Sequence, residues 1–343
     1  MRVPALLSII ILTLAAAARA SDLSLPGPFT AARRDVTVVR AGGSTFTATV
    51  HYPATASTVG APFDASAGPC PVIAFGHGFL TAVTLYQSTA SHLASWGFVV
   101  ALPQTQGGLF PSHSALAADL VSTLDWFAAQ SGIAGSPWQG AIDGARRGVM
   151  GHSMGGGCAL LAAASDPRII AAVPMAPAET NPSSTQACLT TRAATRLIVG
   201  SQDSIVAPST ADPMFANLPG DAQLLSITGG SHCGFIDSAI IACDSGSISR
   251  AQQLTIVRRE TTAFLLPTLA GMSELWCDAW SAPAAGLVRQ DRPTADLDGD
   301  GRVGAGDLAL VLLEFDGCAR GDLDGTGSVD GGDVALLLLQ WSE

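Results

Sequence analysis

Lysine is absent from this chain of 343 residues, and its seventeen basic residues are all arginine. Without lysine, the protein cannot form a Schiff base through a lysine amine. It also cannot hold nucleotide phosphates with the lysine of a P-loop. The arginines do not cluster into a basic patch, so we expect no nucleic-acid partner.

Long uncharged hydrophobic segments are also missing after the first twenty residues, so we expect no membrane span. Residues 1–20 are typical of a secretory signal. Arg2 supplies a basic start, an apolar run covers residues 6–14, and residues 18–20 read Ala-Arg-Ala, a small-x-small cleavage site. The apolar run is too short to span about 30 Å of hydrocarbon. We therefore expect cleavage before Ser21 and a secreted, periplasmic or cell-surface protein.

Charge is concentrated at one end of the chain. The formal net charge is −11, and the segment from Thr294 onward holds eleven acidic residues against two arginines, a net of −9. The larger preceding segment is therefore close to neutral. A neutral surface favours neutral or apolar substrates.

Between about residues 35 and 265, apolar runs typical of strands alternate with longer helix-like stretches. Expected strands lie at 36–40, 45–52, 72–75, 98–102, 148–150, 170–174, 196–200 and 223–227, and expected helices near 83–95, 114–129, 154–165, 210–217 and 250–265. The first two runs predict a hairpin around residues 41–43. The later alternation predicts an α/β fold, a mostly parallel sheet with helices on both faces.

Residues 151–155 read G-H-S-M-G, the G-x-S-x-G pattern of a serine nucleophile. Apolar residues precede the pattern and a small-residue helix is expected after it. A serine on so tight a strand-to-helix turn exposes its hydroxyl, and the flanking glycines permit the turn. Ser153 is therefore the candidate nucleophile.

A serine nucleophile needs a base, and the base needs a carboxylate that orients it. In folds with this elbow the chain order is Ser, then Asp or Glu, then His. His232 is the only histidine after Ser153. Asp203 is the favoured carboxylate, because it follows an expected strand at the end where such sheets place functional groups. The other acidic residues in this interval are expected to be solvated: Asp166, Glu179, Asp212 and Asp221.

A serine nucleophile that attacks a carbonyl also needs two N–H groups that stabilise the developing oxyanion. Met154, directly after the nucleophile, is one expected donor. Phe79, in the glycine-containing segment after the strand at 72–75, is the other, and its ring is a candidate wall of the acyl pocket. We interpret His77 as a residue that orders this loop, and His152 as packing beneath the elbow. Catalysis by this set needs no metal.

The acidic tail contains a repeat with a spacing of 26 residues. Twelve-residue loops start at Asp296 and Asp322, each with acidic residues at positions 1, 3 and 12 and glycine at position 6, and each precedes an apolar helix. This is the pattern of a calcium loop, and it predicts a small all-α module. The candidate Ca²⁺ residues are Asp296, Asp298, Asp300, Arg302, Asp307, Asp322, Asp324, Thr326, Ser328, Asp330 and Asp333.

Several segments together carry a resemblance to a family of α/β-hydrolases. They are residues 76–79 (GHGF), 93–100 (LASWGFVV), 151–157 (GHSMGGG), 176–177 (AP), 203–208 (DSIVAP) and 229–232 (GGSH). The chain resembles the bacterial cutinase and polyester (PET) hydrolase group, and it is similar to chlorophyllase-like and dienelactone-hydrolase-like esterases. The resemblance covers roughly residues 27–268 and implies a secreted serine carboxylic-ester hydrolase of the α/β-hydrolase fold. Its Ser-Asp-His triad would be Ser153, Asp203 and His232, with Phe79 and Met154 as its oxyanion pair.

Two departures from that group concern the substrate. Polyester hydrolases usually carry tryptophan after the Ala-Pro pair, where this chain has Ala178. The oxyanion loop, His77-Gly78-Phe79, is closer to the chlorophyllase-like members. Ester hydrolysis is therefore better supported than cleavage of aromatic polyester.

The tail resembles type I dockerin repeats, which implies calcium and a cohesin-type or cell-surface partner. The loop positions that usually discriminate between partners are Ala305-Gly306 and Gly331-Gly332, which carry almost no side chain. Thr326 replaces a usual acidic or amide ligand, so the second loop is expected to bind more weakly.

Four other functions stay open at this point. A lipase or chlorophyllase-like esterase differs only in the pocket. A dienelactone-type hydrolase would usually carry cysteine at Ser153, a peptidase of the same fold is a further alternative, and a surface-attached binding protein would use only the tail. The predicted organisation is a signal peptide at 1–20, a catalytic domain at 21–280, a linker at 281–293 and the calcium module at 294–343.

The seven cysteines can pair in an oxidising compartment, and at least one must lack a partner within the chain. Cys158, in the helix after the nucleophile, is the candidate free thiol. We interpret Cys233 and Cys243 as a bridge that stiffens the loop of His232. The partners of the remaining cysteines cannot be derived from the sequence: Cys70, Cys188, Cys277 and Cys318.

Overall fold

The computed structural model describes residues 22–276, 286–292, 294–298, 302–317, 320–324, 326 and 328–342. The predicted signal peptide at 1–20 lies outside these residues. Among the described residues, no helix is long and apolar enough to cross a membrane.

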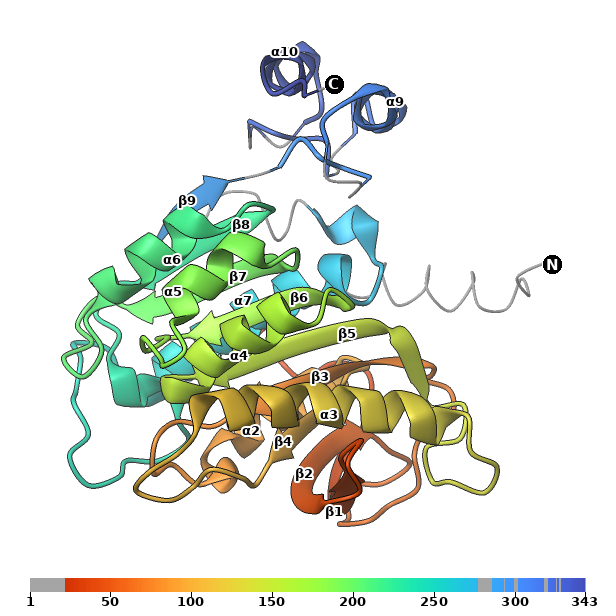
Figure 1. The fold of residues 1–343 in the computed structure, drawn as a ribbon, viewed down its shortest axis with the longest axis vertical. Helices are drawn as coiled ribbons and strands as arrows, with labels where there is room; N and C mark the ends of the chain where they lie inside the picture. Colours follow the sequence, from red (N-terminus) through yellow and green to blue (C-terminus); the bar gives the residue numbers. More distant parts are fainter. Residues whose placement is uncertain are drawn as a thin grey trace.

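One mixed sheet organises the described part of the chain, with nine strands in the order β1-β2-β4-β3-β5-β6-β7-β8-β9 (Figure 1). The strands are β1 Ala31–Val39, β2 Thr45–Pro53, β3 Cys70–Gly76, β4 Val99–Pro103, β5 Ile142–His152, β6 Ile169–Met175, β7 Ala194–Gly200, β8 Ala222–Ile227 and β9 Leu287–Arg292. The six central strands run parallel to one another, in the order β4, β3, β5, β6, β7 and β8. The hairpin β1–β2 and strand β9 add antiparallel edges. This mixed sheet fits an α/β-hydrolase fold.

Helices cover both faces of the sheet, as the alternation predicts (Figure 1). The α-helices of this domain are α2 Gln87–Ser95, α3 His113–Ser131, α4 Met154–Ser165, α5 Ser184–Ala187, α6 Ala211–Asn217 and α7 Arg250–Thr268. Short 3-10 turns are η1 Val83–Tyr86, η2 Cys188–Thr190, η3 Pro208–Thr210, η4 His232–Phe235 and η5 Ser273–Leu275. Helices α2 and α7 share one core cluster with the sheet, while α3 and α4 share another.

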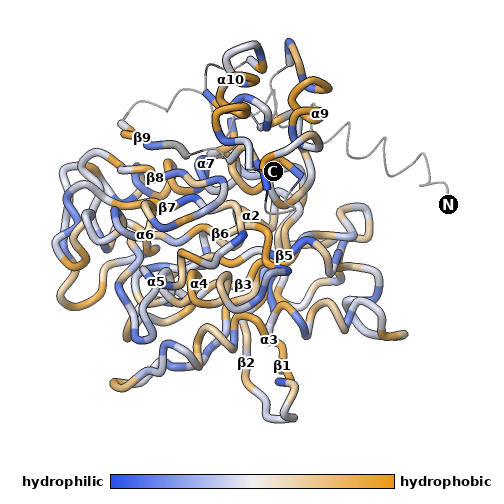
Figure 2. Tube along the Cα trace, turned by 45° about the horizontal axis from the view of Figure 1, so that its top comes forward, coloured by the Kyte–Doolittle hydropathy of each residue, from blue (hydrophilic) through white to orange (hydrophobic). Residues whose placement is uncertain are grey.

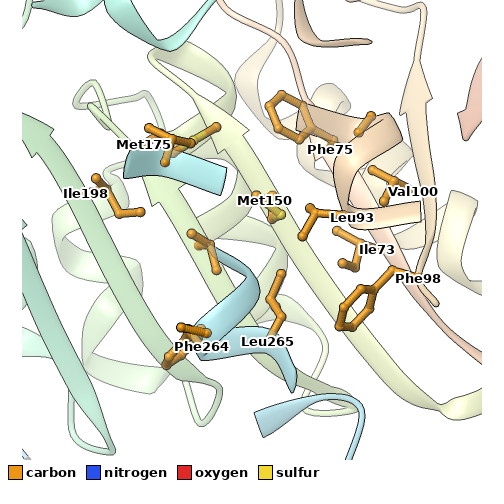
Figure 3. Close-up of a cluster of buried hydrophobic side chains, with 14 of the residues drawn as sticks. Ile73, Phe75, Leu93, Phe98, Val100, Met150, Met175, Ile198, Phe264 and Leu265 are labelled. Carbon is orange, nitrogen blue, oxygen red and sulfur yellow. The ribbon is translucent and has the colours of Figure 1, made fainter. Parts of the chain in front are cut away.

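Strand β3 shows why the sheet has two cores. Ile73 and Phe75 pack in the cluster of α2 and α7, whereas Val72 and Ala74 pack in the cluster of α3 and α4. Successive side chains of a strand point to opposite faces, so a strand covered on both faces must be apolar throughout. Figure 3 shows the first cluster, with Ile73 and Phe75 on the same side of the sheet as Phe264 of α7.

The eight predicted strands and the five predicted helices are confirmed, with ends that differ by a few residues and with residues 83–86 forming the separate turn η1. The one-turn helix α5 was not expected. The predicted linker at 281–293 is wrong for Leu287–Arg292, because these residues form β9 and pair with β8, Ile227 opposite Leu287. This pairing satisfies the backbone groups of a strand that would otherwise be an edge. The small residues and prolines on either side of the strand, at 283–286 and 293, concealed it.

The tail forms a two-helix unit, α9 Ala305–Leu313 and α10 Gly331–Leu339, with its own small apolar core. Both helices are coloured mainly as hydrophobic in Figure 2. The unit is tied to the sheet through Asp221, just before β8. The Asp221 carboxylate accepts hydrogen bonds from the Thr294 N–H and from Nε of Arg320, both at 2.9 Å.

Candidate active site

Ser153 occupies the turn between β5 and α4 in a conformation that few non-glycine residues adopt, with φ 57° and ψ −121°. Such backbone is strained and persists only where its surroundings enforce it. Here the Ser153 N–H donates to the carbonyl of Met175 in β6 at 2.9 Å, and the Ser153 carbonyl accepts the N–H of Ala178 at 3.0 Å. The turn is therefore held by the neighbouring strand and by the loop that follows it.

Two glycines make this turn possible through their lack of a side chain. A β-carbon on Gly151 would lie 2.1 Å from the carbonyl oxygen of Gly155. A β-carbon on Gly155 would lie 2.1 Å from the carbonyl oxygen of Gly76 in β3. The G-x-S-x-G spacing thus reflects a close approach between the helix start and two strands.

Asp203 and His232 meet at the carboxyl ends of β7 and β8. Nδ1 of His232 lies 2.6 Å from Oδ2 of Asp203, and both side chains are buried. Oδ1 of Asp203 accepts the N–H groups of Ile205 and Val206 at 2.9 and 2.8 Å. Because an ionised carboxylate only accepts hydrogen bonds, the Nδ1 of His232 is the donor. In the neutral imidazole, Nε2 is then the basic nitrogen.

Ser153 lies where two apolar cavities meet. One, of about 240 Å³, is lined by Ser153 and His232 together with Phe79 and the isoleucines Ile236, Ile240 and Ile241. The other, of about 500 Å³ and more open, is lined by Ser153, Met154, Phe79, Leu109, Phe110, Pro111, His113 and Ala178. The arrangement can accommodate an apolar group on each side of the Ser153 hydroxyl.

Phe79 and Met154, the two residues expected to donate N–H groups to the oxyanion, lie at the cavities beside Ser153. Phe79 lines both cavities and Met154 lines one. Met154 is the first residue of α4, so its N–H has no acceptor within the helix. The Phe79 segment is held by Tyr86, whose hydroxyl accepts the Gly78 N–H at 3.0 Å. Both residues thus lie at the cavities that contain Ser153.

Two further histidines near the site, His77 and His152, have supporting positions. Nε2 of His77 lies 2.6 Å from the carbonyl oxygen of Thr105, so His77 links its own loop to the segment after β4. The ring of His152 lies 4.5 Å from the ring of His232, and its Nδ1 lies 3.0 Å from the Tyr86 hydroxyl. Burial, with a smaller contribution from the nearby charge of His232, holds the pKa of His152 well below its usual value. His152 is therefore a neutral packing residue.

The remaining carboxylates between Ser153 and His232 do not reach the site. Glu179 accepts hydrogen bonds from the first residues of α5, and Asp212 is exposed. Asp166 and Asp221 are buried rather than solvated as expected, because each pairs with an arginine, Arg168 and Arg320 respectively.

The disulfide between Cys233 and Cys243 is confirmed, and it joins the residue after His232 to the following loop. Cys158 is a free, buried thiol as predicted, and Cys70 and Cys188 are also free and buried. Cys277 and Cys318 lie outside the described residues.

In the tail, carboxylates gather in each predicted loop. Ligand oxygens of Asp296, Asp298 and Asp307 lie within 4.8 Å of one another, and so do those of Asp322, Asp324 and Asp333. Hard oxygen ligands at this density suit Ca²⁺. Asp300 lies outside the described residues.

Four other residues that the sequence predicts as Ca²⁺ ligands lie outside these two carboxylate groups. Asp330 accepts the Gly332 N–H at 2.7 Å as the N-cap of α10. Thr326 and Ser328 are exposed. Arg302 is cationic, so it could contribute only its carbonyl oxygen.

Comparison with known proteins fits this geometry. The family model described as PET hydrolase-like matches residues 16–249, more than half of the chain. The chain belongs to the PET hydrolase-like family. The match includes Ser153, Asp203 and His232, and it ends before the tail repeat.

Curated relatives of this family member are named as a terephthalate hydrolase and as cutinases. A bis(hydroxyethyl) terephthalate hydrolase of Streptomyces coelicolor is 32% identical over 220 residues, 61% of this chain and 62% of the relative. Cutinase est2 of Thermobifida alba is 31% identical over 188 residues, 54% and 56% of the two chains. Cutinase 1 of Thermobifida cellulosilytica is 29% identical over 210 residues, 60% and 72%. The chain thus spans about three fifths of the length of the first two.

Sequence reasoning missed two sets of residues at the site of this PET hydrolase-like protein. The cavity walls formed by residues 109–113 and 236–241 carry no motif. Asp244, whose carboxylate contacts the loops of both Asp203 and His232, was also missed. Its position directly after the predicted bridging Cys243 is the signal that could have identified it.

Proposed function

We propose that this protein is a serine hydrolase of carboxylic esters. The observation that carries the proposal is the 2.6 Å hydrogen bond between Asp203 and His232 at the cavity that also holds the strained Ser153. Membership of the PET hydrolase-like family and relatives named as hydrolases support it.

In the proposed reaction, Oγ of Ser153 attacks the ester carbonyl while Nε2 of His232 takes the hydroxyl proton. The N–H groups of Phe79 and Met154 stabilise the oxyanion of the tetrahedral intermediate. His232 then donates its proton to the leaving alkoxide, which departs as an alcohol and leaves an acyl-serine. Water, deprotonated by His232, attacks the acyl group, and the acid is released as Ser153 regains its proton.

The carboxylate of Asp203 has two physical effects in this scheme. It holds the imidazole with Nε2 available to Ser153, and its negative charge stabilises the imidazolium that forms. Because Asp203 is buried, water screens this interaction little. Each oxyanion donor typically contributes about 3 kcal/mol to transition-state stabilisation.

We propose an apolar ester, polyester or lipid-like, as the substrate class. The cavities beside Ser153 are lined mainly by apolar side chains, and no lysine or arginine that would bind a charged acid is among the described residues that line them. The names of the relatives, a terephthalate ester hydrolase and cutinases, agree with this class.

The test is hydrolysis of p-nitrophenyl esters from acetate to palmitate by wild type and by Ser153→Ala. The exposed Ser209→Ala is the matched control. We expect wild type and Ser209→Ala to prefer short chains and Ser153→Ala to lose turnover. Full activity in Ser153→Ala would refute the proposal. A preference for long chains would identify a lipase and justify replacing the polyester substrate with lipids.

Secretion is proposed as well, on the signal-like residues 1–20. Expression of the full chain in a bacterial host should yield exported protein whose N-terminal residue is Ser21. An intact N-terminus on cytoplasmic protein would contradict this.

For the tail we propose two Ca²⁺ sites, one in each repeat. Asp296, Asp298 and Asp307 would hold the first ion, and Asp322, Asp324 and Asp333 the second, where Ca²⁺ would neutralise the gathered carboxylates. Titration calorimetry of the chelator-treated chain should find two sites, the second weaker. Asp307→Asn should remove the first alone, and no binding in wild type would refute the proposal.

The resemblance to dockerins also leads us to propose a cohesin-type or cell-surface partner for this tail. Binding to an immobilised cohesin module should require Ca²⁺ and should be lost in an Asp307→Asn/Asp333→Asn variant. Binding by neither form would leave the calcium sites without that role.

A further inference from the structure

Asp244 lies outside the two cavities, yet its carboxylate contacts the loops of both Asp203 and His232. Oδ2 accepts the N–H of Ser204 at 3.1 Å and the N–H of His232 at 2.9 Å. Oδ1 accepts the N–H of Cys233 at 2.9 Å. Ser204 directly follows Asp203, so one carboxylate joins the main chain of the acid loop to that of the base loop.

We propose that Asp244 is a positioning residue that sets the relation between Asp203 and His232. The inference rests on the proposed ester hydrolysis, because it concerns the acid and base of that site. The two loops leave different strands, β7 and β8. The Asp203–His232 contact must be kept although the only regular structure described in these loops is the short turns η3 and η4.

The segment that carries Asp244 is itself fixed to both loops. Its preceding residue, Cys243, forms the disulfide with Cys233. The Ser247 N–H donates to Oε1 of Gln202, the residue before Asp203, at 2.7 Å. Gly246 lies so close to the chain before His232 that a β-carbon there would be 1.9 Å from the carbonyl oxygen of Gly229. Asp244 is thus held in place from both sides.

The charge of Asp244 suits this task. Burial raises the pKa of its carboxyl, but the three N–H donors, from Cys233, His232 and Ser204, outweigh burial and hold the pKa below its usual value. An ionised carboxylate accepts all three hydrogen bonds, whereas an amide in its place has one acceptor atom and presents N–H groups to the main chain. Replacement by asparagine should therefore break at least one of the three hydrogen bonds, while the volume of the side chain stays nearly the same.

The first measurement does not need a substrate. The Nδ1 proton of His232, held against Asp203, should give a low-field proton NMR resonance in wild type. We expect Asp244→Asn to shift or broaden it beyond detection, and the exposed Asp212→Asn on α6 to leave it unchanged. An unchanged resonance in a folded Asp244→Asn protein would overturn the proposal, whatever the protein hydrolyses.

The second measurement separates positioning from a general loss of structure. On a p-nitrophenyl ester, Asp244→Asn should lower kcat by at least tenfold and leave KM within about twofold, because Asp244 does not line the cavities. In an Asp203→Ala background the same substitution should change kcat by less than threefold, since the relation it protects is already lost. Equal losses in both backgrounds, or kcat within twofold of wild type, would overturn the proposal.

Should Asp244→Asn fail to fold, Asp244→Glu provides a second variant, because it keeps the charge and displaces the carboxylate by one methylene. We expect it to retain the low-field resonance at a shifted position with a smaller loss of kcat. A wild-type resonance and kcat in Asp244→Glu would overturn the proposal. Loss of activity in Ser153→Ala tests the hydrolase itself, so the two hypotheses fail independently.

Discussion

Gly155 and Gly76 approach each other so closely that a β-carbon on Gly155 would lie 2.1 Å from the carbonyl oxygen of Gly76. Two backbone segments that are far apart in the sequence, the end of β3 and the first turn of α4, therefore meet beside Ser153. The contact places Ser153 next to the loop of Phe79, which leaves β3.

Gly155→Ala tests this contact. The added methyl group has backbone on its far side, which cannot move away as a flexible side chain could, so we expect loss of at least 100-fold in kcat/KM or failure to fold. Gly107→Ala is the matched control, since no heavy atom lies within 4 Å of its β-carbon. The measurement is ester turnover together with thermal unfolding. Wild-type turnover in Gly155→Ala would show that the elbow tolerates a wider separation.

Asp203→Asn should leave the fold intact and lower kcat by about 10³ to 10⁴-fold, since an amide can support the wrong imidazole tautomer. The asparagine keeps the size of the side chain, so substrate binding should change little. Steady-state kinetics gives kcat and KM separately. Asp212→Asn, exposed on α6, should match wild type. A decrease of less than tenfold in Asp203→Asn would mean that another group orients His232.

The disulfide between Cys233 and Cys243 closes a short loop beside His232, with ten residues of sequence separation. Loop-closure entropy predicts that its removal costs about 3 kcal/mol of unfolding free energy. We expect a reductant to lower both the thermal midpoint and ester turnover of wild type. A Cys233→Ser/Cys243→Ser variant should start at these lower values and respond no further. If reductant changes neither quantity in wild type, the bridge does not stiffen the base loop.

His51, buried in β2, should make the protein sensitive to acid. Burial, with a smaller contribution from the charge of Arg33, lowers the pKa of His51 from 6.5 to about 4. The unfolded chain then binds more protons than the folded one between these values. Stability is fully present above pH 6.5 and decreases as pH falls toward 4, by about 3 kcal/mol from this residue.

Urea unfolding between pH 7 and 4 measures this dependence. His51→Asn should reduce the slope of unfolding free energy against pH. Ser91→Ala removes the same side-chain contact, Nδ1 of His51 to the Ser91 hydroxyl, and keeps the titrating group, so its slope should match wild type. Equal slopes in all three proteins would contradict a depressed pKa at His51.

Much of the fold between residues 31 and 268 was predictable from local sequence patterns. Parallel strands covered on both faces must be apolar throughout, so the six strands β3 to β8 were recognisable as apolar runs. Ser153 was also predictable from a local pattern, because the geometry of its turn requires glycines at fixed spacing. His232 followed from chain order alone, as the only histidine after the serine.

Residues whose function depends on contacts between distant segments could not be found in this way. Strand β9 pairs with β8 although the residues on either side of it are typical of a linker, because the open edge of a sheet favours pairing with a neighbouring segment. Asp221 was expected to be solvated, yet Arg320, 99 residues away, pairs with it.

The sequence by itself determined the strand and helix pattern, the elbow and the identity of the acid–base candidates, since periodicity, turn chemistry and residue order are local properties of the chain. Only the tertiary structure decided the distance between Asp203 and His232, the walls of the two cavities and the position of Asp244 between two loops. Those features depend on how strands that are far apart in the chain align in one sheet, and no local pattern encodes that alignment.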